Sequence, residues 1–281
     1  MVKNTDKMGK KKNHRFQKTK TARSSIFGTV DKVIIGICIF CILLSGAGIW
    51  YETLDYFKAK KMYGDLQKYI ALVEETSPAV EEQTYSIDWK SLQTVNPDVV
   101  AWIKIPSTVV DYPIVQAKDN QYYLKKGFDG KKNSCGTIFM NTDNRMDFSD
   151  DNTVLYGHNM KNGSMFAVLN KYREEAFYKE HKEVWLFTPY WERKYQIISA
   201  HKAADGSETY AAEFGDRYAE HVAKEASMSI YDTGNGYNVD LPMVTLSTCT
   251  GHGALDRMVL ICQPVYEMKL DPFIQDSDTV S

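Results

Sequence analysis

The hydrophobic positions divide the chain into one long apolar run, a helical stretch and a series of short apolar segments. Residues 33–51, VIIGICIFCILLSGAGIWY, carry no charged side chain. A run of this length can cross a bilayer of roughly 30 Å as a helix. It ends in Trp50 and Tyr51, residue types that gather at the membrane interface. The pattern predicts a transmembrane anchor at 33–51.

Basic residues crowd the segment before this run. Ten Lys and Arg precede residue 33, although the net charge of the whole chain is only -2. Positive charge beside a first span is retained in the cytoplasm. We therefore predict a cytoplasmic basic tail at 1–32, a single pass through the cell membrane and an extracellular remainder. Topology and anionic lipid explain this charge without nucleic acid. A cleaved signal peptide is the alternative, since Ser45, Gly46 and Ala47 resemble a cleavage site.

The stretch after the anchor has a helical composition. Residues 52–76 are rich in Lys, Glu, Leu and Tyr and contain a single glycine, Gly64. Ser77 and Pro78 are expected to end this helix, and the following residues have the composition of a polar linker. We assign 52–84 to a helical stalk and linker. The remaining 85–281 should form one compact domain, because a chain of 281 residues leaves little room for a second.

Beyond residue 85 the pattern changes to short runs of β-branched and aromatic residues between turn formers. Eight such runs are expected to be strands: 99–105, 109–115, 137–140, 153–156, 184–187, 194–200, 243–246 and 258–262. Helical periodicity interrupts them at 172–181 and 214–228. Many short strands with irregular connections favour a mainly β fold, a barrel or sandwich with helical insertions, over a βαβ array.

Three cysteines lie outside the predicted span, Cys135, Cys249 and Cys262. An odd number in an exported domain leaves at least one thiol without an intramolecular disulfide partner. The segment MVTLSTCTG, 243–251, places Cys249 where a strand gives way to a loop. A thiol there is partly exposed and firmly held, as a reactive group needs to be. A buried structural cysteine is the alternative interpretation of this segment by itself.

A cysteine nucleophile reacts as the thiolate and needs a base or cation nearby. His158 follows the strand NTVLY in the phrase YGHNM, where Gly157 permits an unusual backbone geometry. His252 is the rival base, three residues after Cys249. It lies between two glycines, and a flexible loop positions a base poorly. We therefore favour His158.

Arg257 opens the run RMVLIC, eight residues after Cys249. If the two strands pair, a hairpin of this length returns the guanidinium to the level of the thiol. A permanent cation there would stabilise the thiolate and the oxyanion formed when a carbonyl is attacked. A strand-end ion pair with Asp256 is the alternative. The convergence of a Cys, a His and an Arg favours a catalytic role for all three.

No metal site or cofactor is predicted. Outside the span the sequence has no Cys-x-x-Cys pair, no paired His spacing and no glycine-rich phosphate loop. The acidic residues between 143 and 151 lack the spacing of a calcium loop.

The motif TLSTC, with an Arg at the start of the next strand, resembles the signature of sortases. The stretches NPDVVAWIKIPSTVVDYPIVQ, DNQYYL, GTIFM and NTVLYGHNMKNGSMF are similar to class B sortases in the same order, across 88–265. The resemblance implies an eight-stranded sortase-type β-barrel with helical insertions and an N-terminal helical extension. A long helix between the sixth and seventh strands has its counterpart in 214–228. The domain at 85–281 would be the sortase catalytic domain.

The resemblance also implies an activity, which is the anchoring of proteins to a cell wall of the Gram-positive type. Such a cysteine transpeptidase, or thiol protease, cleaves a C-terminal sorting signal of an exported protein after its Thr. It holds the protein as a thioacyl enzyme and transfers it to an amine of a peptidoglycan precursor or another acceptor. Cys249, His158 and Arg257 match the catalytic trio. Two other functions stay open, a secreted cysteine hydrolase with the same trio and a non-catalytic membrane-anchored surface-binding domain.

Three further positions match those that line the class B substrate groove, Asn120 and Leu124 of DNQYYL and Ser247 of TLSTC. Two departures from the family pattern stand out. The loop TGHGALD after Cys249 is shorter than in some class B members and contains an extra His, and Cys135 replaces another small residue. The resemblance implies no calcium dependence.

Overall fold

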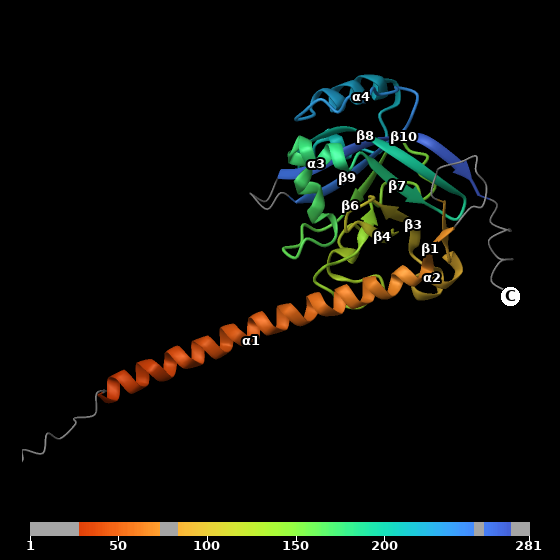
Figure 1. Cartoon of the computed structure of the whole chain (residues 1–281). Coiled ribbons are helices and arrows are strands. Elements are labelled where there is room, and N and C mark those ends of the chain that lie inside the picture. Colours follow the sequence, from red (N-terminus) through yellow and green to blue (C-terminus); the bar gives the residue numbers. More distant parts are fainter. Residues whose placement is uncertain (1–27, 74–83, 250–255, 271–281) are drawn as a thin grey trace, which may run out of the picture. The chain divides into compact units, whose positions relative to one another are not determined.

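Figure 1 shows a computed structural model of the chain, which describes residues 28–73, 84–249 and 256–270. The chain divides into one unit that ends at Trp50 and a second that begins at Tyr51. The first unit holds the N-terminal part of helix α1 (Thr29–Leu66). Its segment Val30–Trp50 is long and apolar enough to cross a membrane, and none of it is buried within the protein. This is consistent with the single-pass anchor predicted at 33–51.

The second unit contains a closed β-barrel, which confirms the predicted fold. Its eight strands follow the order β10-β8-β7-β3-β4-β5-β6-β9, and β9 pairs with β10 to close the ring. Two neighbouring pairs, β4 with β5 and β6 with β9, are parallel, and the others are antiparallel. The strands are β3(Val99–Lys104), β4(Asp111–Val115), β5(Ile138–Met140), β6(Asn152–Tyr156), β7(Glu183–Phe187), β8(Trp191–Ala204), β9(Met243–Cys249) and β10(Asp256–Lys269).

The central parts of the last three strands of the barrel are buried on both faces, which explains their nearly continuous apolar runs. Along β10, Met258 and Leu260 belong to the main core, whereas the intervening Val259 belongs to a second core. This alternation follows from the two-residue period of a strand. Helix α4 (Tyr218–Ser227) contributes Val222 to the second core and lies against β8 (Figure 1). The ends of β9 and β10 are therefore held from both sides.

Strands β8 and β10 extend well beyond the predicted 194–200 and 258–262. They pair with each other from Asp256↔Ala204 to Lys269↔Trp191, with two register shifts. The outer parts of both strands carry charged residues on their exposed faces. Those residues hide the strand pattern in the sequence, because an alternating polar position gives no apolar run.

The predicted stalk helix is wrong at its end. Helix α1 ends at Leu66, and a 3-10 turn, η1(Gln67–Tyr69), leads into β1(Ile70–Val73). This strand pairs antiparallel with β2(Thr84–Ile87) in a separate two-stranded sheet that sequence analysis missed. Pairing with a distant segment overrides the helical composition here. Residues 74–83 lie outside the described part of the chain.

The other helices are close to expectation, with shorter and tighter turns. A short helix begins after Asp88, whose carboxylate accepts a hydrogen bond from the backbone N–H of Ser91 at 2.9 Å. The predicted helix at 172–181 is wrong in form, since a 3-10 segment precedes a shorter α-helix that begins at Glu175. The remaining helical elements are α2(Trp89–Val95), η2(Tyr122–Lys125), η3(Phe166–Arg173), α3(Glu175–Glu180), η4(Glu208–Tyr210) and η5(Gly215–Arg217).

The last turns of α1 belong to the same core as the barrel. Ala59, Tyr63 and Leu66 are 3%, 6% and 5% exposed and belong to the main hydrophobic cluster. Their spacing of four and three residues puts them on one face of the helix. The start of the catalytic domain at residue 85 stays a prediction, but buried side chains already begin within α1.

Candidate active site

Cys249 and Arg257 lie directly opposite each other at the ends of β9 and β10. The guanidinium Nη1 donates a hydrogen bond to Sγ of Cys249 across 3.0 Å. The hairpin thus returns the cation to the level of the thiol, as the spacing predicts. At its other arm, Nη2 lies 3.2 Å from Oδ2 of Asp205. The carboxylate partner in the described residues is Asp205, rather than the neighbouring Asp256.

The guanidinium of Arg257 stays protonated. Burial works against the charged form, but the negative charges of Cys249 and Asp205 outweigh it and raise the pKa of Arg257 above its ordinary value. The planar guanidinium of Arg257 therefore bridges the Asp205 carboxylate and the Cys249 sulfur. Lysine has a single point of charge and could not hold both partners in this geometry.

His158 reaches the same edge of the barrel by a different route. Strands β6 and β9 are parallel, with Tyr156 opposite Ser247. Beyond this pair the backbone N–H of Gly157 donates to the carbonyl of Ser247 at 3.1 Å, and the Thr248 hydroxyl donates to the Gly157 carbonyl at 2.8 Å. The carboxyl ends of parallel neighbours lie at one edge. His158 and Cys249 therefore leave adjacent strands at the same place.

The imidazole of His158 is oriented by one short contact. Its Nε2 lies 2.6 Å from the carbonyl oxygen of Leu124. A carbonyl can only accept, so Nε2 carries a proton and Nδ1 is left for proton exchange. Gly157 is required here because of space: a Cβ would lie 2.5 Å from Cδ1 of Ile138. Its φ is not in the left-handed region, so the expected unusual backbone geometry is wrong.

The three predicted groove residues have different surroundings. Asn120 donates to Oδ1 of Asn141 at 2.7 Å and accepts from the backbone of Thr142, which fixes its side chain. Leu124 is partly buried and touches the site through its carbonyl oxygen. Ser247 is 1% exposed, and its Oγ lies 3.2 Å from the Tyr210 hydroxyl. The structure brings Leu124 and Ser247 to the catalytic edge, and the contacts of Asn120 lie elsewhere.

Sequence reasoning missed three side chains that contact this site. Asp205 holds the outer arm of Arg257, and Tyr210 meets Ser247. Asn170 donates from Nδ2 to the Cys249 carbonyl at 3.2 Å. All three come from the irregular segments η3, η4 and the loop before η4, far along the chain from their partners. No local motif marks them, so only the fold reveals them.

An aromatic wall stands beside Ser247. The rings of Tyr156 and Tyr210 stack with centroids 6.0 Å apart, and Phe139 lies 5.3 Å from Tyr156 on the other side. Burial raises the pKa of Tyr210 to about 12, so its hydroxyl stays protonated at neutral pH. These rings offer apolar surface, and the Tyr210 hydroxyl offers a hydrogen-bond donor next to the strand that carries Cys249.

The other two cysteines of this unit are poor nucleophile candidates. Cys135 and Cys262 are 1% and 0% exposed, whereas Cys249 is partly accessible. Burial also raises the pKa of the Cys262 thiol. The rival base His252 and its loop lie outside the described residues. Within the described ranges, no group of three or more His, Cys, Asp or Glu is arranged to hold a metal.

Comparisons with known proteins point to one family. The family model described as Sortase domain matches residues 103–265. Sortase B of Listeria monocytogenes is 34% identical over 162 residues, which cover 57% of this chain and 66% of that protein. Sortase B of Staphylococcus aureus is 28% identical over 230 residues, 81% of this chain and 91% of that protein.

Solved structures give the same result. Sortase B from Bacillus anthracis in complex with AAEK1 has a TM-score of 0.65 at 30% identity, covering 75% of this chain and 98% of that one. Sortase B from Clostridium perfringens has a TM-score of 0.60 at 30% identity, covering 63% and 99%.

The chain therefore belongs to the sortase family. These relatives and structural neighbours are sortase B proteins, so the chain is a class B sortase, a cysteine transpeptidase. Enzymes of this family act on sorting signals and amine acceptors. A plain cysteine hydrolase and a non-catalytic binding domain are not favoured.

Proposed function

We propose that Cys249, His158 and Arg257 are the catalytic residues of this sortase. In this proposal, Cys249 cleaves the C-terminal sorting signal of an exported protein after its Thr, and the enzyme transfers the protein to a cell-wall amine. The observation that carries the proposal is the 3.0 Å contact between Nη1 of Arg257 and Sγ of Cys249. A guanidinium at this distance donates to the sulfur and can also reach an oxyanion that forms beside it.

In the first step the Cys249 thiolate attacks the Thr carbonyl carbon. A bond forms between sulfur and carbon, and the carbonyl electron pair moves to oxygen. Because Arg257 already contacts the sulfur, its guanidinium lies beside the carbon that becomes tetrahedral. Its N–H groups can then donate to the new oxyanion. Asp205 keeps the outer arm of the fork in place at 3.2 Å.

The tetrahedral intermediate collapses when the bond from carbon to the leaving nitrogen breaks. His158 starts this step as the imidazolium and gives the Nδ1 proton to the leaving amine. This leaves a thioacyl group on Cys249 and a neutral imidazole. The incoming amine then attacks the thioester carbon and loses a proton to Nδ1. Expulsion of the thiolate restores the starting state.

The substrate and acceptor follow from the family. Asn120, Leu124 and Ser247 are proposed to line the groove for the sorting-signal peptide, beside the aromatic wall of Tyr156 and Tyr210. A solved neighbour is a Staphylococcus aureus sortase B–substrate complex, with a TM-score of 0.59 and 29% identity. The acceptor is proposed to be an amine of a peptidoglycan precursor. No cofactor enters any step.

The orientation in the membrane is also a proposal. The basic tail at 1–32 stays in the cytoplasm, the helix crosses the membrane, and the barrel faces the cell wall. The basis is the charge asymmetry around an apolar helix whose span is Val30–Trp50.

The test uses the full chain in detergent with a library of sorting-signal pentapeptides, with and without triglycine as an amine. Mass spectrometry should show an acyl-enzyme and, with the amine, a peptide joined to triglycine. Release of the hydrolysed acid alone, at the same rate with and without triglycine, would favour the hydrolase instead.

A further inference from the structure

A tyrosine of the N-terminal helix reaches into the catalytic domain. Tyr63, in the last turns of α1, is 6% exposed, and its hydroxyl donates to the carbonyl oxygen of Gly136 at 2.5 Å. The Tyr63 hydroxyl oxygen also lies 3.1 Å from Oγ1 of Thr137. Burial raises the pKa of Tyr63, so the hydroxyl keeps its proton. The sorting mechanism described above makes no use of this buried donor.

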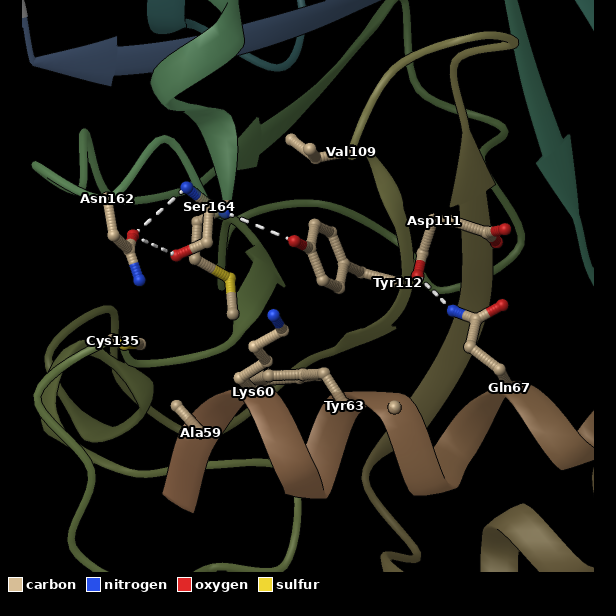
Figure 2. Close-up of a pocket in the computed structure, with 12 residues that line it drawn as sticks. Ala59, Lys60, Tyr63, Gln67, Val109, Asp111, Tyr112, Cys135, Asn162 and Ser164 are labelled. Carbon is tan, nitrogen blue, oxygen red and sulfur yellow. Dashed lines mark hydrogen bonds between the residues drawn. The ribbon is translucent and has the colours of Figure 1, made fainter. Parts of the chain in front are cut away.

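Figure 2 shows Tyr63 on α1 at the edge of a cavity of about 520 Å³ that Cys135 and Tyr112 also line. The rings of Tyr63 and Tyr112 meet edge to face with centroids 5.3 Å apart. The ring is therefore held by packing, and the hydroxyl is held by the Gly136 carbonyl and the Thr137 hydroxyl. These two attachments can be separated by substitution, because phenylalanine keeps the first and removes the second.

Gly136 is the link to the catalytic histidine. Its φ is +61°, and a Cβ at this residue would lie 2.9 Å from Cδ2 of His158. The same Cβ would lie 3.0 Å from the carbonyl oxygen of Leu124 and 2.7 Å from that of Tyr123. Only a glycine lets the backbone come this close. The Gly136 backbone therefore lies so close to both the imidazole ring and the carbonyl that orients it that no side chain fits between them.

A second hydrogen bond joins the two backbone segments beside His158, residues 136–137 and residues 123–124. The backbone N–H of Thr137 donates to the Tyr123 carbonyl at 3.1 Å, one residue before Leu124. Leu124 then accepts from Nε2 of His158 at 2.6 Å. The Tyr63 hydroxyl and the imidazole thus contact two backbone segments, 136–137 and 123–124, that are joined by this hydrogen bond.

We infer that Tyr63 is a positioning residue for His158, which it holds through the Gly136 carbonyl, the Gly136 backbone and the Leu124 acceptor. The inference rests on the proposed catalytic role of His158. Fixing the acceptor keeps the proton of the neutral imidazole on Nε2 and leaves Nδ1 for the leaving amine. The helix whose earlier turns form the apolar span Val30–Trp50 therefore contributes to the catalytic site in its last turns.

The test compares Tyr63→Phe with Tyr178→Phe in the full chain in detergent micelles. Tyr178 is a matched control, because it is 2% exposed and its hydroxyl donates to the Thr233 carbonyl at 2.7 Å, without any described contact to the site. The histidine side chains are labelled with 15N, and the His158 signal is assigned by its loss in His158→Ala. Acylation is followed with the library pentapeptide that the wild-type chain cleaves fastest.

Wild type and Tyr178→Phe should show neutral His158 as the Nε2–H tautomer. In Tyr63→Phe the Nδ1–H tautomer should become populated, and kcat for acylation should fall about tenfold at unchanged KM, since small displacements of a catalytic group cost this much or more.

Two results would overturn the inference. One is a His158 signal in Tyr63→Phe that matches that of Tyr178→Phe, whatever the activity. The other is a changed tautomer with acylation as fast as wild type. If no pentapeptide acylates the wild-type chain, the proposed function fails, and the tautomer comparison alone decides whether Tyr63 positions His158.

Discussion

The two sides of the proposed active site are built in different ways. On one side, Cys249 and Arg257 face each other across a single antiparallel strand pair. On the other side, His158 is positioned by segments from α1, η2, the turn before β5 and the end of β6. One of the contacts that join them runs from Nε2 of His158 to the Leu124 carbonyl at 2.6 Å.

The difference has a physical consequence. A strand register is all or none, because a slip by one residue turns every side chain to the other face. A side chain held by loops and single hydrogen bonds, such as that of His158, can shift by fractions of an ångström. We therefore expect the side with Cys249 to respond sharply to change, and the support around His158 to respond in graded steps.

Among the variants that keep Cys249, the largest effect is expected from the base itself. His158→Ala should lower the acylation rate by about 100-fold to 10,000-fold, the usual contribution of a general acid or base. His252→Ala should stay within a few-fold of wild type, and single-turnover mixing with peptide measures both. If His252→Ala lost activity while His158→Ala kept it, the base would be assigned wrongly.

Arg257→Lys should come next. Removal of a donor to an oxyanion costs on the order of 100-fold to 1000-fold in rate, and lysine cannot reproduce the fork between Sγ and Asp205. The variant should fold normally and keep Cys249 open to alkylation. A near wild-type acylation rate would mean that Arg257 is only a strand-end ion-pair partner, whose loss costs roughly 0 to 1 kcal/mol.

Asp205→Asn should have a much smaller effect. The side chains of Arg257 and Asp205 are 26% and 46% exposed, so solvent screens the pair. Loss of such an ion pair corresponds to at most about fivefold in rate. Steady-state kcat and KM at two salt concentrations measure it, with Asp256→Asn as the control. A loss as large as that of Arg257→Lys would show that Asp205 takes part in the chemistry.

The smallest expected effect is a pH dependence of stability that comes from α4, the helix of the second core behind the strands that carry Cys249 and Arg257. His221 is 4% exposed, and burial lowers its pKa below the ordinary value of 6.5. Below that pH the unfolded chain takes up a proton that the folded chain does not, so stability should fall as the pH drops. The neighbouring Glu225 adds to this trend at lower pH: burial raises its pKa, but its contacts with His201, Thr209 and His221 together outweigh burial and lower it.

Thermal melts between pH 7.5 and 5.5 check this trend. The wild-type melting temperature should decrease on acidification, and His221→Leu should reduce the slope. Equal slopes for the two proteins would show that His221 is not the group responsible.

The cysteine side could be predicted from the sequence, because its information is local. The apolar runs that end at Cys249 and begin at Arg257 mark two strands, and their spacing fixes the hairpin. The histidine side could be predicted only in part. The phrase YGHNM points to His158, but nothing near it points to Tyr63 or Gly136, whose contacts depend on how the chain folds over long separations.

The same reason explains the errors in the fold. The eight strands follow from local patterns of residues, whereas β1 forms only because it pairs with β2, beyond residues 74–83. Segments whose conformation depends on a distant partner carry a weak local signal.

The central claim is that Cys249 carries the acyl group. The direct measurement is peptide mapping by mass spectrometry of the full chain after brief exposure to the cleaved pentapeptide. The acyl mass should appear on the peptide that contains Cys249 in wild type, Cys135→Ala and Cys262→Ala, and should be absent from Cys249→Ala. An acyl adduct on another residue, or turnover that persists in Cys249→Ala, would contradict the account.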